Sequence, residues 1–466
     1  MKEVIYKMNN FSISDLPKGA YIHMIGIGGI SMSGIAEMLL NFGYKVSGSD
    51  AKSSGLTDRL KQNGAEIFIG QSADNIKNPD AVCYTAAISP DNPELVKAKT
   101  LGIPVVERAV FLGALLEKYK YPIAVAGTHG KTTTSSMLSL VLLAAHKDPT
   151  ILIGGELSQI GGNYHIGGNE YLPFEACEYV ESFLHFKPFV SIITNIEEDH
   201  LDYFKDLNHI ITSFVKFASL TSDNGCNIVC IDENTTQSIV QNVKKKAVTY
   251  ALNNKNADYT AENITLEKNG CPTFDIFNKD RKVLSVSLNV AGDHNICNAL
   301  GVTAACEFLG IEPEYIKSGL EEFRGAKRRF DRLGKTETGV DVVDDYAHHP
   351  TEIKTTLETA KKMGYNNVWV AFQPHTYTRT AAFLEQFASA LKTADRVMIT
   401  DIYPAREKYD GTMHACDLAR LIPGVVYMND MDAMKRYILS NAKPGDLVIT
   451  MGAGNICDLG YSLTQK

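Results

Sequence analysis

The sequence predicts an α/β protein of three domains, and three observations lead to this prediction. The chain has 466 residues, enough for two to four domains of roughly 100–200 residues each. Strand and helix signals alternate through three successive blocks, and each block opens on an apolar strand. Glycine-rich or polar segments follow several of these strands, where open α/β sheets bind their ligands. We expect domains at residues 1–115, 116–327 and 328–466.

Composition narrows the class of protein. Apolar residues make up 44% of the chain and charged residues 21%, as in ordinary globular proteins. The net charge of −8 gives no support to nucleic-acid binding. The N-terminal segment lacks the apolar core of a signal peptide, and no apolar run is long enough to span a bilayer. We therefore expect a cytoplasmic protein with neither a nucleic-acid nor a membrane partner, and we make no prediction of its oligomeric state.

The cysteines are expected to be free thiols. There are nine, an odd number, scattered mostly inside apolar runs. Cys226 and Cys230 have a C-x-x-x-C spacing within an apparent buried strand. No second ligand pair lies nearby in the sequence, so zinc binding by these two is not expected.

The first block predicts a Rossmann-like domain. An apolar strand from residue 21 runs into the loop GIGGIS at 26–31 and then a helical segment. A second strand at 44–50 ends in Asp50, and further strands fit 80–88 and 103–106. The loop matches the dinucleotide fingerprint G-x-G-x-x-G only loosely, with Ser31 in the last place. An NAD-dependent dehydrogenase is one alternative, but such an enzyme needs no lysine phosphate loop in its next domain.

The second block predicts a P-loop ATPase-like domain with added β-strands. A strand at 122–127 leads into GTHGKTTT and a helix that ends near 145. Strands also fit 188–195 and 226–231. Residues 246–290 are expected to form short antiparallel strands with polar turns, followed by helices at 294–309 and 313–323.

The third block predicts a second Rossmann-like α/β domain. Strands fit 340–346, 367–374, 395–403 and 446–456, with helices between them. The block starts near Asp331, and the basic run KRRFDRLG at 327–334 lies at this predicted domain junction. Most such runs are solvated, but an arginine at a domain junction can also stabilise a phosphoryl group in transfer.

The phosphate loop lacks one common feature. Counting back from Gly130 in the pattern G-x-x-x-x-G-K-[ST], the first glycine is replaced by Val125. Gly127 and Gly130 let backbone N–H groups face a phosphate at a helix N-terminus. Lys131 is expected to reach the β- and γ-phosphates, and Thr132 to give its hydroxyl oxygen to Mg²⁺. His129, at the apex of the loop, is either solvated or in contact with a second substrate.

This shorter loop, G-T-x-G-K-T after an apolar strand, resembles that of the Mur ligase family, the amino-acid ligases of bacterial cell-wall precursor synthesis. The resemblance extends over nearly the whole chain. It implies ATP as cosubstrate, and the loop residues expected to bind it are Gly127, Thr128, His129, Gly130, Lys131, Thr132 and Thr133.

The resemblance also implies a second metal site in the central domain. Glu178 and His200 match the family's ligands to a second Mg²⁺ over the γ-phosphate, beside the first ion on Thr132. Cys177 and Tyr179 depart from the Asp-Glu-Ser pattern of many relatives. From spacing alone, the glutamates at 175, 178 and 181 are typical of a solvated helical stripe. We keep that interpretation for the first and last of them.

Further residues are implied to meet the nucleotide and the amino acid. His294 and Asn295 match a pair that contacts the base, and Arg329 matches a phosphate-contacting arginine. In DDYAHHPTEI, Asp345 is implied to face ATP and Tyr346 to pack near the adenine. His348 would lie toward the amino acid, and Arg379 would hold its carboxylate. Thr376 stands where relatives often carry another arginine. Zinc binding by His348 and His349 is a weaker alternative, because adjacent histidines do not readily share one ion from a helix.

In the first domain the resemblance replaces the dinucleotide with a uridine diphosphate substrate, because any pyrophosphate suits backbone N–H groups at a helix N-terminus. The implied contacts to that substrate are Gly28, Gly29, Ile30, Ser31, Asp50, Thr85, Glu107, Arg108 and His129.

The implied reaction joins L-alanine to the lactyl carboxylate of UDP-N-acetylmuramate through an acyl phosphate, with ATP and two Mg²⁺. Lys131, Glu178, His200, Arg329, His348 and Arg379 are the implied catalytic residues. Three alternatives stay open: a ligase that attaches a recycled peptide, an NAD-dependent dehydrogenase, and a non-catalytic nucleotide-binding protein.

Overall fold

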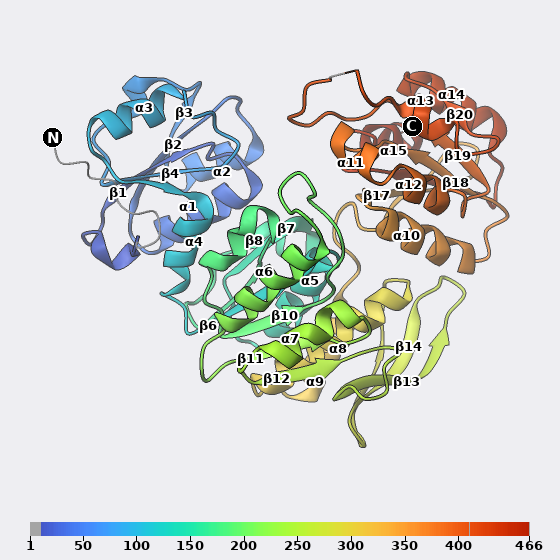
Figure 1. Ribbon diagram of the computed structural model, residues 1–466, viewed down its shortest axis with the longest axis horizontal. Helices are drawn as coiled ribbons and strands as arrows, with labels where there is room; N and C mark the ends of the chain where they lie inside the picture. The colour runs from blue at the N-terminus through green and yellow to red at the C-terminus, as the bar shows by residue number, and fades with distance from the viewer. Residues whose placement is uncertain (1–10, 410, 466) are drawn as a thin grey trace.

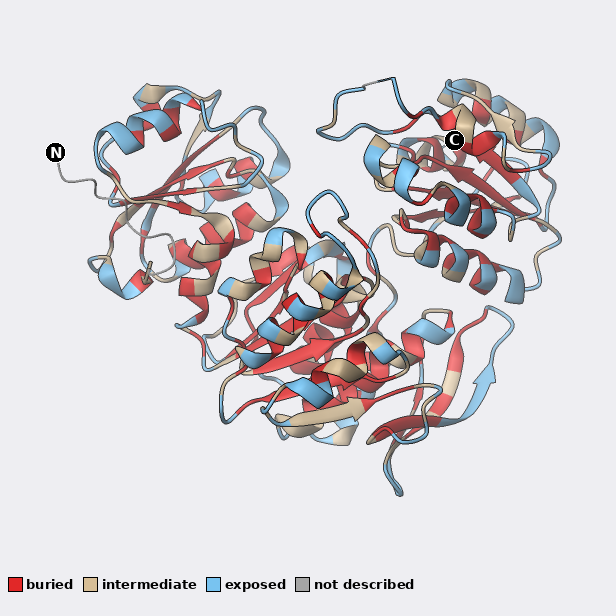
Figure 2. Ribbon diagram, viewed as in Figure 1, coloured by how far each residue is buried: buried red, intermediate tan, exposed pale blue. Residues whose placement is uncertain are grey.

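The computed structural model describes residues 11–409 and 411–465 and confirms the predicted fold class. The described chain contains three sheets of five, ten and six strands, each flanked by helices. Figure 1 shows them as three lobes, with the central lobe touching both others. The inner strands of each sheet are buried, whereas edge strands such as β3 (Glu66–Ile69), β15 (Arg281–Ser287) and β16 (Asp331–Lys335) and the outer faces of the helices are largely exposed (Figure 2). The exact domain boundaries remain a prediction.

The N-terminal sheet is parallel, in the order β3-β2-β1-β4-β5. Strand β3 was not predicted, because its run EIFI is only four residues long. The strands are β1 (Tyr21–Ile25), β2 (Lys45–Asp50), β3 (Glu66–Ile69), β4 (Ala81–Tyr84) and β5 (Val105–Glu107). The helices are α1 (Ile30–Asn41), α2 (Gly55–Gln62), α3 (Pro93–Thr100) and α4 (Arg108–Leu116).

The central sheet has the order β15-β14-β13-β12-β11-β10-β6-β9-β7-β8. Its strands are β6 (Tyr121–Ala126), β7 (Ile151–Leu157), β8 (Gly162–His165), β9 (Tyr171–Glu175), β10 (Val190–Ile193), β11 (Cys226–Cys230), β12 (Ala247–Tyr250), β13 (Tyr259–Leu266), β14 (Pro272–Asn278) and β15 (Arg281–Ser287). Its helices are α5 (Lys131–Ala144), α6 (Leu207–Ser219), α7 (Asn234–Asn242), α8 (Asp293–Phe308) and α9 (Pro313–Glu322).

Two expectations for this domain were wrong. The segment 246–290 is not entirely antiparallel, because β12 pairs in parallel with β11 and only β13–β15 form an antiparallel meander. Glu175 is not on a solvated helix: it ends strand β9, where it accepts hydrogen bonds from Gly154 N at 2.6 Å and Ser135 Oγ at 3.4 Å. The three-residue spacing of the glutamates was therefore accidental. Glu181 lies in the irregular 3-10 segment η4 (Tyr179–His185).

The C-terminal sheet has the order β16-β17-β21-β18-β19-β20, and only the edge strand β16 is antiparallel. Its strands are β16 (Asp331–Lys335), β17 (Asp341–Asp345), β18 (Val368–Phe372), β19 (Arg396–Ile399), β20 (Val426–Tyr427) and β21 (Leu447–Met451). Its helices are α10 (Pro350–Lys362), α11 (Tyr377–Ala382), α12 (Leu384–Leu391), α13 (Ala415–Ala419), α14 (Met431–Asn441) and α15 (Cys457–Thr464).

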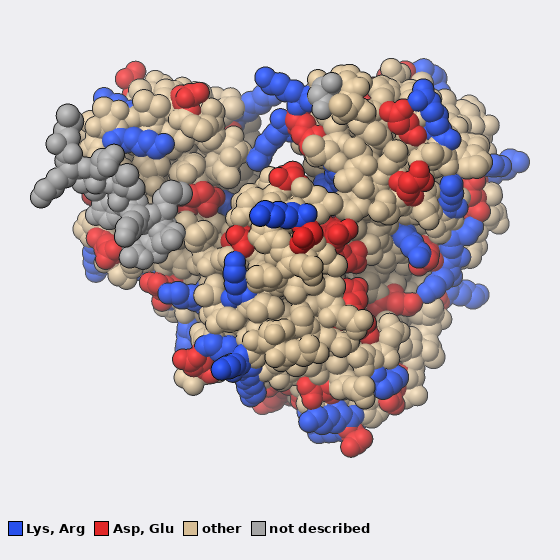
Figure 3. All heavy atoms as spheres, viewed as in Figure 1, with Lys and Arg blue, Asp and Glu red and all other residues tan. Residues whose placement is uncertain are grey.

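Two observations concern possible partners: the distribution of charge on the surface, and the length and apolar character of the helices. Acidic and basic side chains are interspersed over the face shown in Figure 3, with no extended basic patch. Among the described residues, no helix combines the length and the apolar character that crossing a bilayer requires.

Helix α4 fastens the N-terminal domain to the central one at Gly113. A Cβ at this position would lie 2.2 Å from the carbonyl oxygen of His185 in η4, a backbone atom that cannot turn aside. We expect Gly113→Ala to lower the free energy of unfolding by about 1–3 kcal/mol through overpacking. Chemical denaturation measures this. The control is Gly55→Ala in α2, where a Cβ meets nothing within 4 Å. Equal stability of the two variants would contradict the close contact.

Candidate active site

The phosphate loop has a backbone that only glycine adopts readily. Gly127 has φ of +141°, and a Cβ there would lie 2.0 Å from Thr194 Oγ1. Gly130 has φ of +84° and precedes α5 without any side-chain cap, so the first N–H groups of the helix stay available. Loop and helix together form the anion-binding geometry that the sequence predicted.

Lys131, the first residue of α5, is anchored beside the loop. Its Nζ donates to Gly127 O, to Thr128 O at 3.2 Å, and to the two carboxylate oxygens of Glu178 at 3.0 and 3.2 Å. Burial alone would lower the pKa of Lys131, but Glu178 outweighs it and the pKa is raised. The ammonium therefore stays charged in a largely buried position.

The three predicted metal ligands line one small cavity of about 140 Å³. Thr132 follows the loop, Glu178 is 3% exposed, and His200 Nε2 lies 4.0 Å from Glu178 Oε1. Glu175 and Asp199 line the same cavity, although sequence analysis assigned neither a role. Carboxylate and hydroxyl oxygens suit Mg²⁺. The run of acidic residues at 197–199, directly after a predicted strand, is a sequence signal that could have found Asp199, whereas no sequence signal marks Glu175 as a residue of the site.

A larger cavity of about 910 Å³ adjoins the first, and it suits a nucleotide-sized ligand. All three domains line it: Ile30, Leu56 and Arg59 come from the first, and Arg329 and Glu352 from the third. Residues that line both cavities are His129, Gly130, Thr132, Arg329 and Glu352. His294, Asn295 and Asp345, predicted for the nucleotide, also line the larger cavity. The two cavities thus adjoin and share part of their lining at the phosphate loop.

Two residues of the third domain, Asp345 and Tyr346, were predicted to contact the nucleotide, and only Asp345 lines the larger cavity. Asp345 is buried and accepts hydrogen bonds from Phe330 N at 2.9 Å and Ala347 N at 2.7 Å. Burial raises its pKa to about 6, although Arg329 opposes the shift. Tyr346 lines neither cavity, and its ring packs against the Arg329 guanidinium at 5.2 Å. Asp345 therefore stabilises the loop that carries Arg329, and the Tyr346 ring packs against the guanidinium of Arg329.

The two residues predicted for the amino acid lie near the smaller cavity. His348 lines it, and its Nδ1 is 3.1 Å from the carbonyl of Tyr346. Burial lowers the pKa of His348 to about 4, so the ring is neutral at pH 7. Arg379 lines neither cavity, since its guanidinium bonds Asp199 Oδ1 at 2.7 and 3.2 Å. Thr376, in place of an arginine, caps α11.

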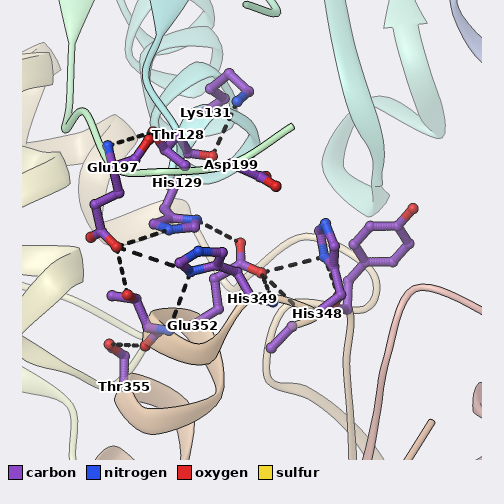
Figure 4. A network of polar contacts seen from close by, with 12 residues as sticks. Thr128, His129, Lys131, Glu197, Asp199, His348, His349, Glu352 and Thr355 are labelled. Atoms are coloured by element: carbon purple, nitrogen blue, oxygen red, sulfur yellow. Dashed lines mark hydrogen bonds and ion pairs between the residues drawn. The ribbon is translucent and has the colours of Figure 1, made fainter. Parts of the chain in front are cut away.

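His129 joins the loop to the third domain (Figure 4). Its Nδ1 lies 3.2 Å from Glu352 Oε1 on α10, and its Nε2 lies 3.6 Å from Glu197 Oε2. The His349 ring packs 4.7 Å away, and Thr351 Oγ1 donates to Glu197 at 2.5 Å. Burial would lower the pKa of His129, but the two carboxylates raise it to about 9. Neither glutamate was predicted: the pairing of β10 with β6 brings Glu197 to the loop, and the docking of the third domain brings Glu352.

The predicted uridine-diphosphate residues surround the first glycine loop. Gly28 N donates to Asp50 Oδ2 at 2.9 Å, and Arg108 donates to Ser31 Oγ at 3.1 Å. Glu107 caps α4. A Cβ on Gly26 would meet Thr85 at 2.9 Å, and Gly29 is the N-cap of α1. Of the predicted residues of this domain only Ile30 lines the larger cavity. The Asp50 carboxylate thus already accepts a hydrogen bond from the glycine turn. A dehydrogenase would need this carboxylate to bind the ribose of NAD, so the contact disfavours that alternative.

The structure thus has three α/β domains that meet around a phosphate-binding loop. This arrangement is that of a nucleotide-binding enzyme whose site is assembled from separate domains. Family models match in the same order: "Mur ligase family, catalytic domain" over residues 21–120, "Mur ligase middle domain" over 125–306, and "Mur ligase, glutamate ligase domain" over 328–454. The chain therefore belongs to the Mur ligase family.

Individual relatives are similar over almost their whole length. UDP-N-acetylmuramate--L-alanine ligase of Acetivibrio thermocellus is 50% identical over 457 residues, which cover 97% of each chain. The crystal structure of UDP-N-acetylmuramate-alanine ligase from Thermotoga maritima has a TM-score of 0.79 and 32% identity, covering 95% of this chain and 98% of that one. A murein peptide ligase from Psychrobacter arcticus has a TM-score of 0.70 and 25% identity, covering 96% and 98%.

The His129 contact predicts a pH-dependent stability. The pKa rises from 6.5 to about 9 on folding, so the charged ring contributes stability that is complete below pH 6.5 and is lost as pH rises through about 9. His129→Gln should reduce stability at pH 6 by up to about 3 kcal/mol and have little effect above pH 9.5. Thermal unfolding across this range measures the difference. The control His165→Gln should show a constant offset, and a pH-independent difference for His129→Gln would refute the contact.

Proposed function

We propose that this protein is an ATP-dependent ligase that joins L-alanine to the lactyl carboxylate of UDP-N-acetylmuramate. One observation supports this most strongly: all three domains line the larger of the two adjoining cavities at the phosphate loop. A reaction with a nucleotide, a nucleotide-sugar acid and an amino acid needs three binding surfaces around one point. The curated relatives at about 50% identity carry the names of this activity.

The proposed reaction has two steps. A carboxylate oxygen of UDP-N-acetylmuramate attacks the γ-phosphorus of ATP, the bond to the β-phosphate oxygen breaks, and ADP leaves. The amine of L-alanine then attacks the acyl carbon, and the C–O bond breaks to release phosphate. Both reactants of the first step are anions, so positive charge must be concentrated there. Lys131 comes from the central domain and Arg329 from the third, and both reach the smaller cavity.

Magnesium is part of this proposal. The residues of the smaller cavity fit Mg²⁺, since Thr132, Glu178 and Glu175 offer hard oxygen donors and His200 adds a nitrogen. When bound, Mg²⁺ neutralises the β- and γ-phosphates during transfer. We propose two ions, one at Thr132 and one between Glu178 and His200. Glu178, now paired with Lys131, would be one of the residues that hold an ion there.

The second step needs an unprotonated amine and a dry site. His348 is neutral, and its Nδ1–H is directed to the Tyr346 carbonyl, which leaves Nε2 as an acceptor for a hydrogen bond from the amino group. Arg379 is proposed to hold the carboxylate of L-alanine, in competition with Asp199. The docked α10 covers the phosphate loop through His129, which excludes water from the acyl phosphate.

Lys131→Ala tests the proposal. Removing the ammonium from the γ-phosphate position should lower the rate of ADP formation with UDP-N-acetylmuramate and L-alanine by at least about 1000-fold. The control Lys354→Ala removes an exposed lysine of α10 and should keep full activity. A coupled ADP-release assay measures both.

The same assay separates the alternatives. L-alanine should support turnover, whereas a murein tripeptide should not. Full turnover by Lys131→Ala, or turnover only with the tripeptide, would overturn the proposed function. A protein that binds ATP but releases no ADP with both substrates present would be a non-catalytic nucleotide-binding protein.

A further inference from the structure

A second cluster of metal-binding side chains lies apart from both cavities. Cys230 ends strand β11, Asp232 follows two residues later, and Cys297 lies in α8. The two sulfur atoms are 3.6 Å apart, and Asp232 Oδ2 is 4.0 Å from Cys297 Sγ. One ligand atom from each of the three residues lies within 4.8 Å of the other two. None of the three lines either cavity, so the reaction proposed above leaves them without a role.

The fold holds this cluster in a fixed arrangement. Asp232 accepts hydrogen bonds from the backbone N–H groups of Leu252 at 2.8 Å, Asn253 at 2.8 Å and Asn254 at 3.0 Å. A carboxylate has about four lone-pair sites, so these three bonds orient Asp232 and leave it able to bind a cation. Cys230 is 5% exposed, whereas Cys297 is only partly buried. Cys297 is therefore the more exposed of the two cysteines.

The distances suit a shared metal better than a disulfide. Two thiolates that each lie about 2.3 Å from a tetrahedral ion are about 3.8 Å apart, close to the separation found here. A disulfide would need the sulfur atoms to approach to about 2.05 Å. We propose that Cys230, Asp232 and Cys297 bind one Zn²⁺ ion, with water as the fourth ligand. Two thiolates with one carboxylate form a donor set that favours zinc over magnesium.

Binding of the ion exchanges protons for the metal. When Zn²⁺ binds, two S–H bonds break, two Zn–S bonds form and two protons leave to solvent. No oxidant or reductant takes part. The bound cation compensates the two thiolates and the carboxylate, and its affinity therefore rises with pH.

The proposed site has a structural consequence for the cavity beside it. Glu233 and Asn298 follow Asp232 and Cys297 directly in the sequence, and both line the larger cavity. An ion at the cluster would tie the segment from the end of β11 to Glu233, the N-cap of α7, to helix α8, which carries Asn298. Zn²⁺ should therefore stabilise the folded protein without being consumed in the reaction.

Cobalt titration of the metal-free full-length protein tests the proposal. Thiolate ligands give Co²⁺ an intense near-ultraviolet charge-transfer band, which oxygen and nitrogen ligands do not give. The second donor group of the described residues, His129, Glu197 and His349, contains no sulfur and cannot produce this band. We expect one equivalent of Co²⁺ to develop the band and Zn²⁺ to abolish it by displacement.

Variants locate the site. Cys230→Ala and Cys297→Ala should each lose the band and bind Zn²⁺ at least about 100-fold more weakly. The control Cys306→Ala removes another buried thiol of α8 and should keep the band. Cys297→Ala is the informative variant if Cys230→Ala fails to fold, because Cys297 is less buried. Absence of the band from the wild-type protein, or its survival in Cys297→Ala, would overturn the proposal.

Discussion

The contact of His129 with Glu352 and Glu197 is the interaction on which the geometry of the site depends. His129 is held at the apex of the phosphate loop by glycines on either side, and Glu352 belongs to the first turn of α10 in another domain. The contact fixes how far the third domain stands from the loop. It thereby places Arg329 and His348 beside Lys131. Without this docking, the residues of the third domain would face solvent rather than a phosphate.

A second constraint is the balance of charge before substrates arrive. The cations of the site are already paired with carboxylates: Lys131 with Glu178, and Arg379 with Asp199. Buried charges need such partners, because an unpaired ion would be costly to desolvate. In the proposed reaction, substrate phosphates and the amino-acid carboxylate would replace the carboxylate partners of Lys131 and Arg379, and metal ions would replace these cations as partners of the freed carboxylates. The pairs therefore keep the side chains ordered and also define which charges the ligands must bring.

Much of the fold and part of the site could be predicted from the sequence. Apolar strands followed by glycine or polar residues marked the ligand-binding edges of the sheets, and the loop from Gly127 to Thr132 was recognisable because its chemistry is local. What failed depended on tertiary pairing. The parallel register of β12 and the strand position of Glu175 follow from neighbours distant in sequence. Likewise, only folding brings Glu352 to His129 and places Cys230 next to Cys297.

The central claim is that the carboxylate of the nucleotide-sugar substrate meets the γ-phosphate at this loop. Isotope transfer tests it most directly. UDP-N-acetylmuramate labelled with ¹⁸O in its lactyl carboxylate is turned over with ATP and L-alanine, and the released phosphate is analysed by mass spectrometry. The account predicts that each phosphate carries one oxygen atom from the carboxylate, because that atom bridges carbon and phosphorus in the acyl phosphate. Unlabelled phosphate from a reaction that forms the amide would contradict it.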